Sequence, residues 1–109
     1  MLKLLVAVDG SELSLDGVRH VLELAKSGLQ ASVVLANVQE SATLYEMVVA
    51  HDPVVLREVS QSAGKHQLAA AEALLQAAGM RFESVVESGD PANTLVDLAE
   101  RYACDVIVL

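Results

Sequence analysis

Cysteine and aromatic residues are scarce in this chain of 109 residues. Cys104 is the only cysteine, which excludes an intramolecular disulfide and a cysteine-based zinc cluster. Tryptophan is absent and aromatic residues make up only 3% of the sequence, which argues against the stacking platforms that bind single-stranded nucleic acid. Hydrophobic residues nevertheless account for 53%, so we expect an aliphatic core that folds without disulfides or metals.

Basic residues are also few, since 7 Lys and Arg stand against 15 Asp and Glu and the net charge is −8. DNA or RNA would be repelled, and no nucleic-acid partner is expected. A small anion held locally by backbone N–H groups is compatible with this charge, particularly when a divalent cation accompanies it. The initial run MLKLLVAVDGS reaches an acid too early for a signal peptide and is too short to span a membrane, so we expect a cytoplasmic protein without a membrane partner.

Short aliphatic runs alternate with segments of helical periodicity along the whole chain. Strands are predicted at residues 2–8, 31–38, 81–87 and 104–109. Helices are predicted after Ser11, at residues 54–78 and from Pro91, with Ser11 and Asp90 as N-caps and a long loop at residues 39–53. This alternation predicts one α/β domain over residues 1–109, an open parallel sheet with helices on both faces.

All three predicted helices show an apolar stripe, and that of the third consists of Leu95, Leu98, Ala99 and Tyr102. Gly17 interrupts the first helix at a cost of about 1 kcal/mol relative to alanine, which a close approach of helix and sheet would explain. The stripe of the first helix consists of Leu15, Val18, Val21, Leu22 and Ala25. The stripe expected for the second consists of Leu56, Val59, Ala63, Ala70, Leu74 and Ala78.

The last predicted strand, Cys104 to Leu109, is apolar and has no helix after it. At the edge of a sheet such a strand would present unpaired backbone groups and invite aggregation. We therefore expect that further chain follows it, the alternative being that another subunit covers it.

The turn after the first strand reads VAVDGSELS, from Val6 to Ser14. Ligands of parallel α/β proteins usually sit at such strand-to-helix turns. The turn has one glycine, so it matches neither the GxGxxG dinucleotide fingerprint nor the GxxxxGK[ST] phosphate loop. It also lacks the clustered acids of a response regulator, because Asp9 stands alone. These absences exclude the commonest phosphate-binding folds.

Three stretches resemble the universal stress proteins, of the adenine nucleotide α-hydrolase-like superfamily. LLVAVDGSELS resembles the opening strand and turn of the family, and LANV resembles its second strand end, with Asn37 where histidine is common. The stretch ESGDPANTLVDLAERYACDVIVL resembles the signature G-x-P-x-x-x-I-x-x-x-A…D-x-I-V-x. The matching residues are Gly89, Pro91, Leu95, Ala99, Asp105, Ile107 and Val108.

The resemblance implies a parallel sheet of order 3-2-1-4-5, here 3-2-1-4 with the fifth strand and last helix missing from this chain. It implies a homodimer and, in many members, a bound ATP with Mg²⁺ or Mn²⁺. Asp9 would contact the ribose or adenine, and the Val38 backbone would contact adenine. Ala7, Val8 and Leu109 would line the pocket, and the phosphates would lie in a loop G-x2-G-x9-G-[ST] expected after Leu109.

Simpler readings of the same residues stay open. Asp9 could tighten its turn, Ser11 could serve only as a helix cap, and Val38 could be plain strand-end core. His51-Asp52 in the long loop could orient a proton-transfer group, but the sequence places no nucleophile beside it. We predict no catalytic residues, no metal-binding residues, and at most a weak ATPase.

Three functions are compatible with the sequence. The first is an ATP-binding regulatory or sensor protein in a stress response. The second is a dimeric stress-response interaction module that binds no nucleotide. The third, an ATP-cleaving enzyme, ranks last because the related synthetases carry an SGGxDS loop that Asp9-Gly10-Ser11-Glu12 does not match.

Overall fold

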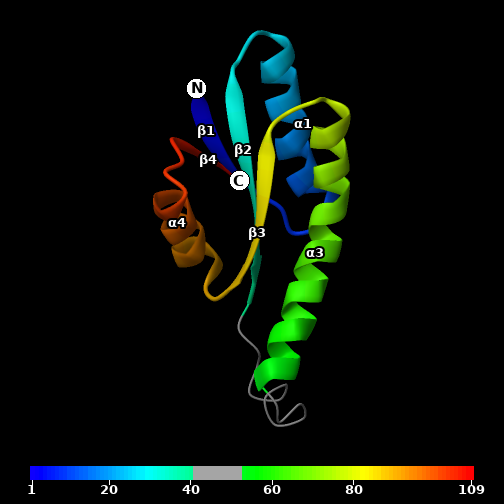
Figure 1. Ribbon diagram of the computed structural model, residues 1–109, viewed down its shortest axis with the longest axis vertical. Coiled ribbons are helices and arrows are strands. Elements are labelled where there is room, and N and C mark those ends of the chain that lie inside the picture. Colours follow the sequence, from blue (N-terminus) through cyan, green and yellow to red (C-terminus); the bar gives the residue numbers. More distant parts are fainter. Residues whose placement is uncertain (41–52) are drawn as a thin grey trace.

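A computed structural model describes residues 1–40 and 53–109 of the chain. The elements follow in the order β1 (Leu2–Ala7), α1 (Glu12–Lys26), β2 (Ala31–Gln39), α3 (Pro53–Ala77), β3 (Phe82–Ser88), α4 (Pro91–Arg101) and β4 (Val106–Val108) (Figure 1). The predicted elements are confirmed, and most of their ends lie one or two residues from the predicted positions. Most of the predicted long loop, including His51-Asp52, lies outside the described residues.

The described strands form one parallel sheet of order β3-β2-β1-β4, which confirms the predicted fold class and strand order. In the register, Leu5 of β1 lies opposite Val34 of β2 and Ile107 of β4. β1 is therefore paired on both sides. The edges of the described sheet are β3 and β4, and on β4 the residues Val106 and Ile107 are 44% and 37% exposed.

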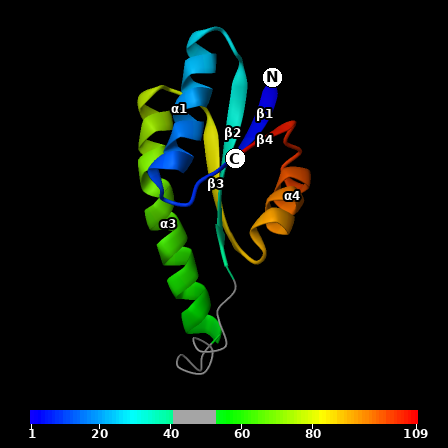
Figure 2. The same cartoon turned by 180° about the vertical axis from the view of Figure 1, so that it is seen from behind.

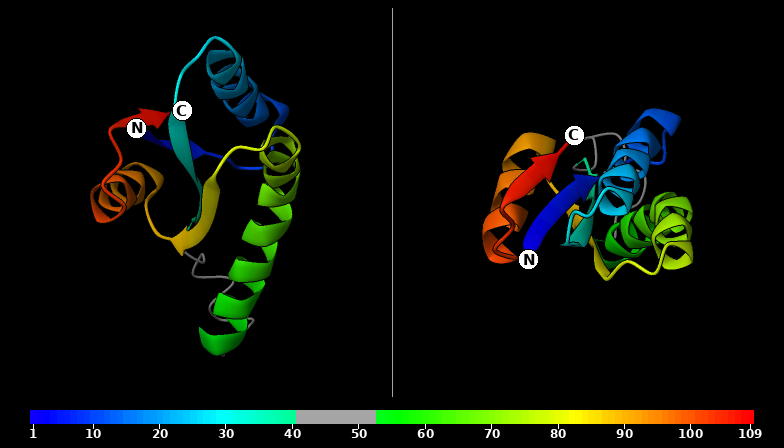
Figure 3. Two further views of the ribbon diagram at one scale, coloured as in Figure 1. Left: turned by 45° about the horizontal axis from the view of Figure 1, so that its top comes forward. Right: turned by 90° about the horizontal axis from the view of Figure 1, so that it is seen from above.

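Helices cover both faces of the sheet, as predicted. α1 and α3 pack on one face and α4 on the other, as the views from behind and from above show (Figures 2 and 3). Side chains of β1 alternate between the two faces, because successive residues of a strand point in opposite directions. Leu4, Val6 and Val8 face α1 and α3, whereas Leu5 packs against Leu98 and Ala99 of α4.

The helix starts form as the sequence predicts. The Ser11 side chain accepts a hydrogen bond from the Ser14 N–H at 3.1 Å, and the Asp90 carboxylate accepts one from the Asn93 N–H at 3.0 Å. Pro91 occupies the first turn of α4, where its missing N–H costs nothing. Because α1 follows β1 and α4 follows β3 after short turns, both capped helices begin beside the carboxyl ends of the strands.

The stripe predicted for α3 is partly wrong. Val59 is 61% exposed, and Ala70 and Ala78 are exposed as well, while Leu56 is not among the described side chains. The buried positions follow a different helical line, at Gly64, Leu68, Ala71 and Leu75. A count of apolar residues misses this face because it begins with glycine and is flanked by polar residues.

Candidate functional site

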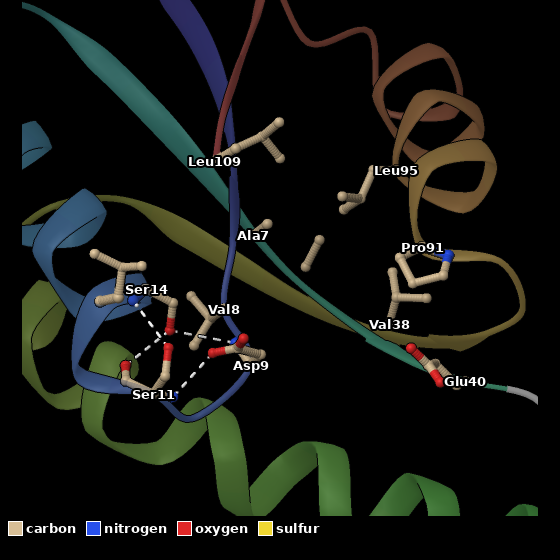
Figure 4. A pocket seen from close by; sticks show the side chains of 12 residues that line it. Ala7, Val8, Asp9, Ser11, Ser14, Val38, Glu40, Pro91, Leu95 and Leu109 are labelled. Carbon is tan, nitrogen blue, oxygen red and sulfur yellow. Dashed lines mark hydrogen bonds between the residues drawn. The ribbon is translucent and has the colours of Figure 1, made fainter.

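A pocket of about 340 Å³ opens at the carboxyl ends of the strands, between the start of α1 and the start of α4 (Figure 4). The predicted site residues Ala7, Val8, Asp9, Val38 and Leu109 all line it. The rest of its wall consists of Ser11, Leu13, Ser14, Ala36, Glu40, Pro91 and Leu95. The structure thus brings the predicted residues together from three strands, while their contact with a ligand stays a prediction.

The topology explains why a pocket forms here. From β1 the chain crosses through α1 on one face of the sheet to β2, whereas β3 connects to β4 through α4 on the other face (Figure 3). The helices that follow β1 and β3 therefore diverge and leave a crevice above the strand ends. This is the switch point at which open α/β sheets bind ligands.

Asp9 is fixed by the turn that it begins. Its Oδ1 accepts a hydrogen bond from the Ser11 N–H at 2.9 Å, and its own N–H donates to Ser14 Oγ at 3.3 Å. The Ser14 hydroxyl donates in turn to the Ser11 carbonyl at 2.9 Å. The structural roles considered for Asp9 and Ser11 are therefore real. They do not preclude a ligand, because a carboxylate has about four acceptor sites and the Asp9 side chain stays exposed.

Hydrogen bonds from Ser11, through its side chain and then its backbone N–H, hold the pKa of the Asp9 carboxyl below its usual value of 3.8. Burial works in the opposite direction but is the weaker influence. Asp9 is therefore ionised at neutral pH. An ionised carboxylate forms stronger hydrogen bonds with hydroxyl donors than a neutral oxygen does.

The main chain of Val38 faces the pocket. The Val8 N–H donates to the Ala36 carbonyl at 2.9 Å, so the polar groups of Ala36 point toward β1. Backbone groups alternate along a strand, and those of Val38 therefore point to the same side. The β1–β2 pairing ends at Ala7 and Ala36, which leaves the N–H and C=O of Val38 facing the space beyond β1. A strand edge of this kind can pair with the polar edge of a flat ring.

The remaining wall is apolar and acidic. Its apolar lining includes Ala7, Ala36 and Leu95, together with Leu13 and Leu109, which are 80% and 89% exposed. Asp9 and Glu40 add two carboxylates (Figure 4). Among the lining residues of the described parts there is no Lys, Arg or His. The described residues also contain no group of three His, Cys, Asp or Glu side chains that could hold a metal ion.

A cluster of amides braces the turn from beneath, and the sequence analysis missed it. Asn37, only 1% exposed, donates through Nδ2 to the Val8 carbonyl at 2.9 Å and to Gln67 Oε1 at 2.8 Å. Gln39 Nε2 donates to Asn37 Oδ1 at 2.7 Å and to Gln67 Oε1 at 2.9 Å. The cluster ties the end of β1 to β2 and α3, because a buried amide must find partners within the protein.

Glu40 is a charged lining residue that the sequence analysis did not assign to the pocket. It follows Val38 by two positions, and residues two apart lie on the same face of a strand. This spacing from Val38 could have predicted that Glu40 lines the pocket. Pro91 and Leu95 were noted in the resemblance without being assigned to the pocket, which they reach because they lie in the first turns of α4.

The fold and the pocket define a class of protein, a parallel α/β domain with a ligand site at its switch point. The family model of the universal stress proteins matches residues 1–109. The chain belongs to the universal stress protein family. A universal stress protein of Methanocaldococcus jannaschii is 24% identical over 107 residues, which make up 98% of this chain and 62% of that protein. The chain thus spans less than two thirds of the length of this relative.

Solved structures agree with the fold. A universal stress protein family member from Burkholderia pseudomallei has a TM-score of 0.75 and 25% identity, over 96% of this chain and 77% of that one. An Arabidopsis thaliana family member with AMP bound has a TM-score of 0.70 and 20% identity, over 98% and 74%. A universal stress protein in complex with cAMP has a TM-score of 0.71 and 22% identity, over 99% and 75%. In the described parts of this chain, no helix has the length and apolar character needed to cross a membrane.

Proposed function

We propose that this chain is a regulatory or sensor protein of the stress response that binds an adenine nucleotide, ATP included, at the switch-point pocket. One observation carries the proposal: residues from β1, β2 and the end of the chain, selected from sequence alone, line one pocket. The AMP and cAMP bound by two structural relatives support the ligand class. The proposed location is the cytoplasm.

Each part of an adenine nucleoside has a counterpart in the pocket. The adenine ring would lie against Ala7, Val8 and Leu109, with its polar edge toward the main chain of Val38. The ribose hydroxyls would donate to the Asp9 carboxylate, whose Oδ1 is already oriented by the Ser11 N–H. A ligand held in this way is anchored at its uncharged end, which suits reversible sensing.

Mg²⁺ or Mn²⁺ would accompany ATP as its counterion. Asp9 and Glu40 supply oxygen donors of the kind that Mg²⁺ prefers, but a magnesium site usually relies on the phosphates and water for most of its ligands. The described residues offer no cluster of three acidic, His or Cys side chains. An ion would therefore enter with the nucleotide, and hydrolysis would be weak at most.

The proposal is tested by titration calorimetry with ATP, AMP and cAMP against the wild type and Asp9→Asn. Asparagine keeps an acceptor for the Ser11 N–H, so the turn is retained while the charge is lost. We expect Asp9→Asn to weaken each ligand about tenfold, the effect of losing a charge-assisted hydrogen bond of ~1.5 kcal/mol or more. Asp97→Asn on the exposed side of α4 is the control. Absence of binding by all three nucleotides would overturn the proposal.

A dimeric interaction module that binds no nucleotide is the second candidate. The observation that favours it is the edge strand β4, whose Val106 and Ile107 are partly exposed in the described structure. A second copy of the chain would cover such a strand. Sedimentation would then give a dimer, and nucleotides would leave the melting temperature unchanged.

A further inference from the structure

Two polar features of the pocket lie on separate segments, Asp9 on the turn after β1 and the main chain of Val38 at the end of β2. The last backbone hydrogen bond that the described residues form between these segments joins the Val8 N–H to the Ala36 carbonyl, at 2.9 Å. Beyond it, the described turn is bonded to β2 through the side chain of Asn37. The spacing between Asp9 and Val38 therefore depends on side chains rather than on the backbone ladder.

Gln67 of α3 supports the residues on either side of Asp9. A Cβ atom placed on Gly10, whose φ is +88°, would lie 3.0 Å from Gln67 Cγ and 3.3 Å from Gln67 Cβ, so the turn packs on the stem of this side chain. On the other side of Asp9, the Val8 carbonyl accepts a hydrogen bond from Asn37 Nδ2, which also donates to Gln67 Oε1. Gln67 thus holds one neighbour of Asp9 by packing and the other through Asn37.

The same glutamine oxygen binds the residues on either side of Val38. Gln67 Oε1 accepts hydrogen bonds from Asn37 Nδ2 at 2.8 Å and from Gln39 Nε2 at 2.9 Å. The end of β2 is also paired with β3, up to Gln39 opposite Ser88. The end of β2 therefore keeps a strand partner without Gln67, whereas the turn that carries Asp9 depends on the amide cluster.

Among the described residues, α3 contributes none to the lining of the pocket, and it packs on the face of the sheet away from α4 (Figure 3). We infer that Gln67 is a positioning residue of this site: its Oε1 fixes the spacing between the Asp9 carboxylate and the Val38 main chain, and the pocket therefore favours a ligand that reaches both. The inference rests on the proposed function and refines it. In the pose proposed there, a nucleoside spans the two features, whereas free adenine uses only the β2 side. Groups held at the correct spacing before binding avoid the cost of being ordered by the ligand.

The decisive variant is Gln67→Met, which keeps the stem that packs on Gly10 and removes the acceptor oxygen. Titration calorimetry of the 109-residue chain with AMP, in about 0.15 M salt, gives the affinity for the nucleotide. Ligand-observed NMR gives the affinity for adenine. We expect Gln67→Met to weaken AMP binding about three- to tenfold, the effect of losing an ordinary hydrogen bond or slightly more. Adenine binding should change less than about twofold, because β3 still holds the end of β2.

Two variants serve as controls, each measured below its melting temperature. Gln61 lies on the same helix and donates to the Val86 carbonyl of β3 at 3.1 Å. Gln61→Met therefore removes a bond between α3 and the sheet away from Asp9 and Val38, and AMP binding should change less than about twofold. Gln67→Glu keeps acceptor oxygens for both amides and should bind AMP within about threefold of the wild type, since the salt screens the added charge.

The outcomes separate the inference from the proposed function. Equal losses of AMP and adenine affinity in Gln67→Met would overturn the inference, because a general loss of structure weakens every ligand alike. Unchanged AMP binding in Gln67→Met, an equal loss in Gln61→Met, or a Gln67→Glu variant no better than Gln67→Met would overturn it too. In all these cases the wild type binds AMP and the proposed function stands. If the wild type does not bind AMP, the inference falls, and the titrations with ATP and cAMP decide the proposed function.

Discussion

Two glycines inside helices should respond in opposite ways to the same substitution. Gly17 lies in α1 and Gly64 in α3. Alanine is worth about 1 kcal/mol more than glycine at an interior helix position, provided that the added methyl group has room. The main difference between the two sites is the space available for that methyl group. Comparing the two alanine variants therefore tests how tightly each helix packs on the sheet.

At Gly17 a Cβ atom would lie 3.4 Å from a methyl group of Val108 and 3.8 Å from one of Val6. These are ordinary contact distances, so the predicted approach of α1 to the sheet is real but leaves space for a methyl. Gly17→Ala should therefore stabilise the protein by about 1 kcal/mol and raise the melting temperature by about 4 °C.

At Gly64 a Cβ atom would lie 2.8 Å from Asn37 Oδ1 and would overlap a methyl group of Val86. Both neighbours belong to packed strands, so α3 would have to move away from β2 and β3. Overpacking of this kind costs about 1–3 kcal/mol. After the helix gain is subtracted, Gly64→Ala should destabilise the protein by up to about 2 kcal/mol.

Urea unfolding followed by circular dichroism at 222 nm measures both variants against the wild type. The expected difference in unfolding free energy between the two variants is about 1–3 kcal/mol. Comparison of the urea midpoints at a shared slope resolves a difference of this size. A Gly64→Ala variant as stable as Gly17→Ala would refute the packing of α3 against Asn37 and Val86.

Two further predictions concern the turn. Ser11→Ala should cost about 1 kcal/mol through loss of the helix cap and should raise the pKa of the Asp9 carboxyl toward its usual value, as measured by NMR titration. Because the pKa of Asp9 is lowered in the folded state, its contribution to stability is present above the unfolded pKa and is lost as the pH falls through the folded pKa. The Ser11→Ala variant should therefore lose less stability in acid than the wild type does. An unchanged pKa of Asp9 in the variant would contradict this. Asn37→Leu should cost about 1–3 kcal/mol in urea unfolding, since it leaves the buried Val8 carbonyl without its side-chain donor and takes one of two donors from Gln67 Oε1. It should also weaken adenine nucleotide binding; unchanged stability would show that the amide cluster does not brace the turn.

The sequence predicted best where each element has a single clear pattern. β1 is aliphatic on both faces and α1 has one unbroken stripe at Leu15, Val18 and Val21, so both were found with nearly correct bounds. α3 was placed correctly, but not its buried face. Exposed Val59 and Ala70 match the apolar pattern as well as the buried Leu68 does, and only the position of the sheet distinguishes them.

The candidate site likewise contains residues that the sequence could predict and residues that it could not. Asp9 could be found because it lies in the turn that follows a strand, and Val38 entered through the family resemblance. The amide cluster could not be found, because it joins residues 29 and 30 positions apart along the chain. Which face of α3 presents Gln67 to Asn37 depends on helix packing that no local pattern encodes.

Asp9 is held in place before any ligand arrives. Its Oδ1 is fixed by the Ser11 N–H, and the preceding Val8 carbonyl is fixed by the buried amide of Asn37. Loops that must become ordered on binding lose affinity, whereas a preorganised group avoids that cost. The hydrogen bonds that make Asp9 look purely structural are therefore the same ones that would make it an effective acceptor for a ribose. A structural role and a binding role support each other at this residue.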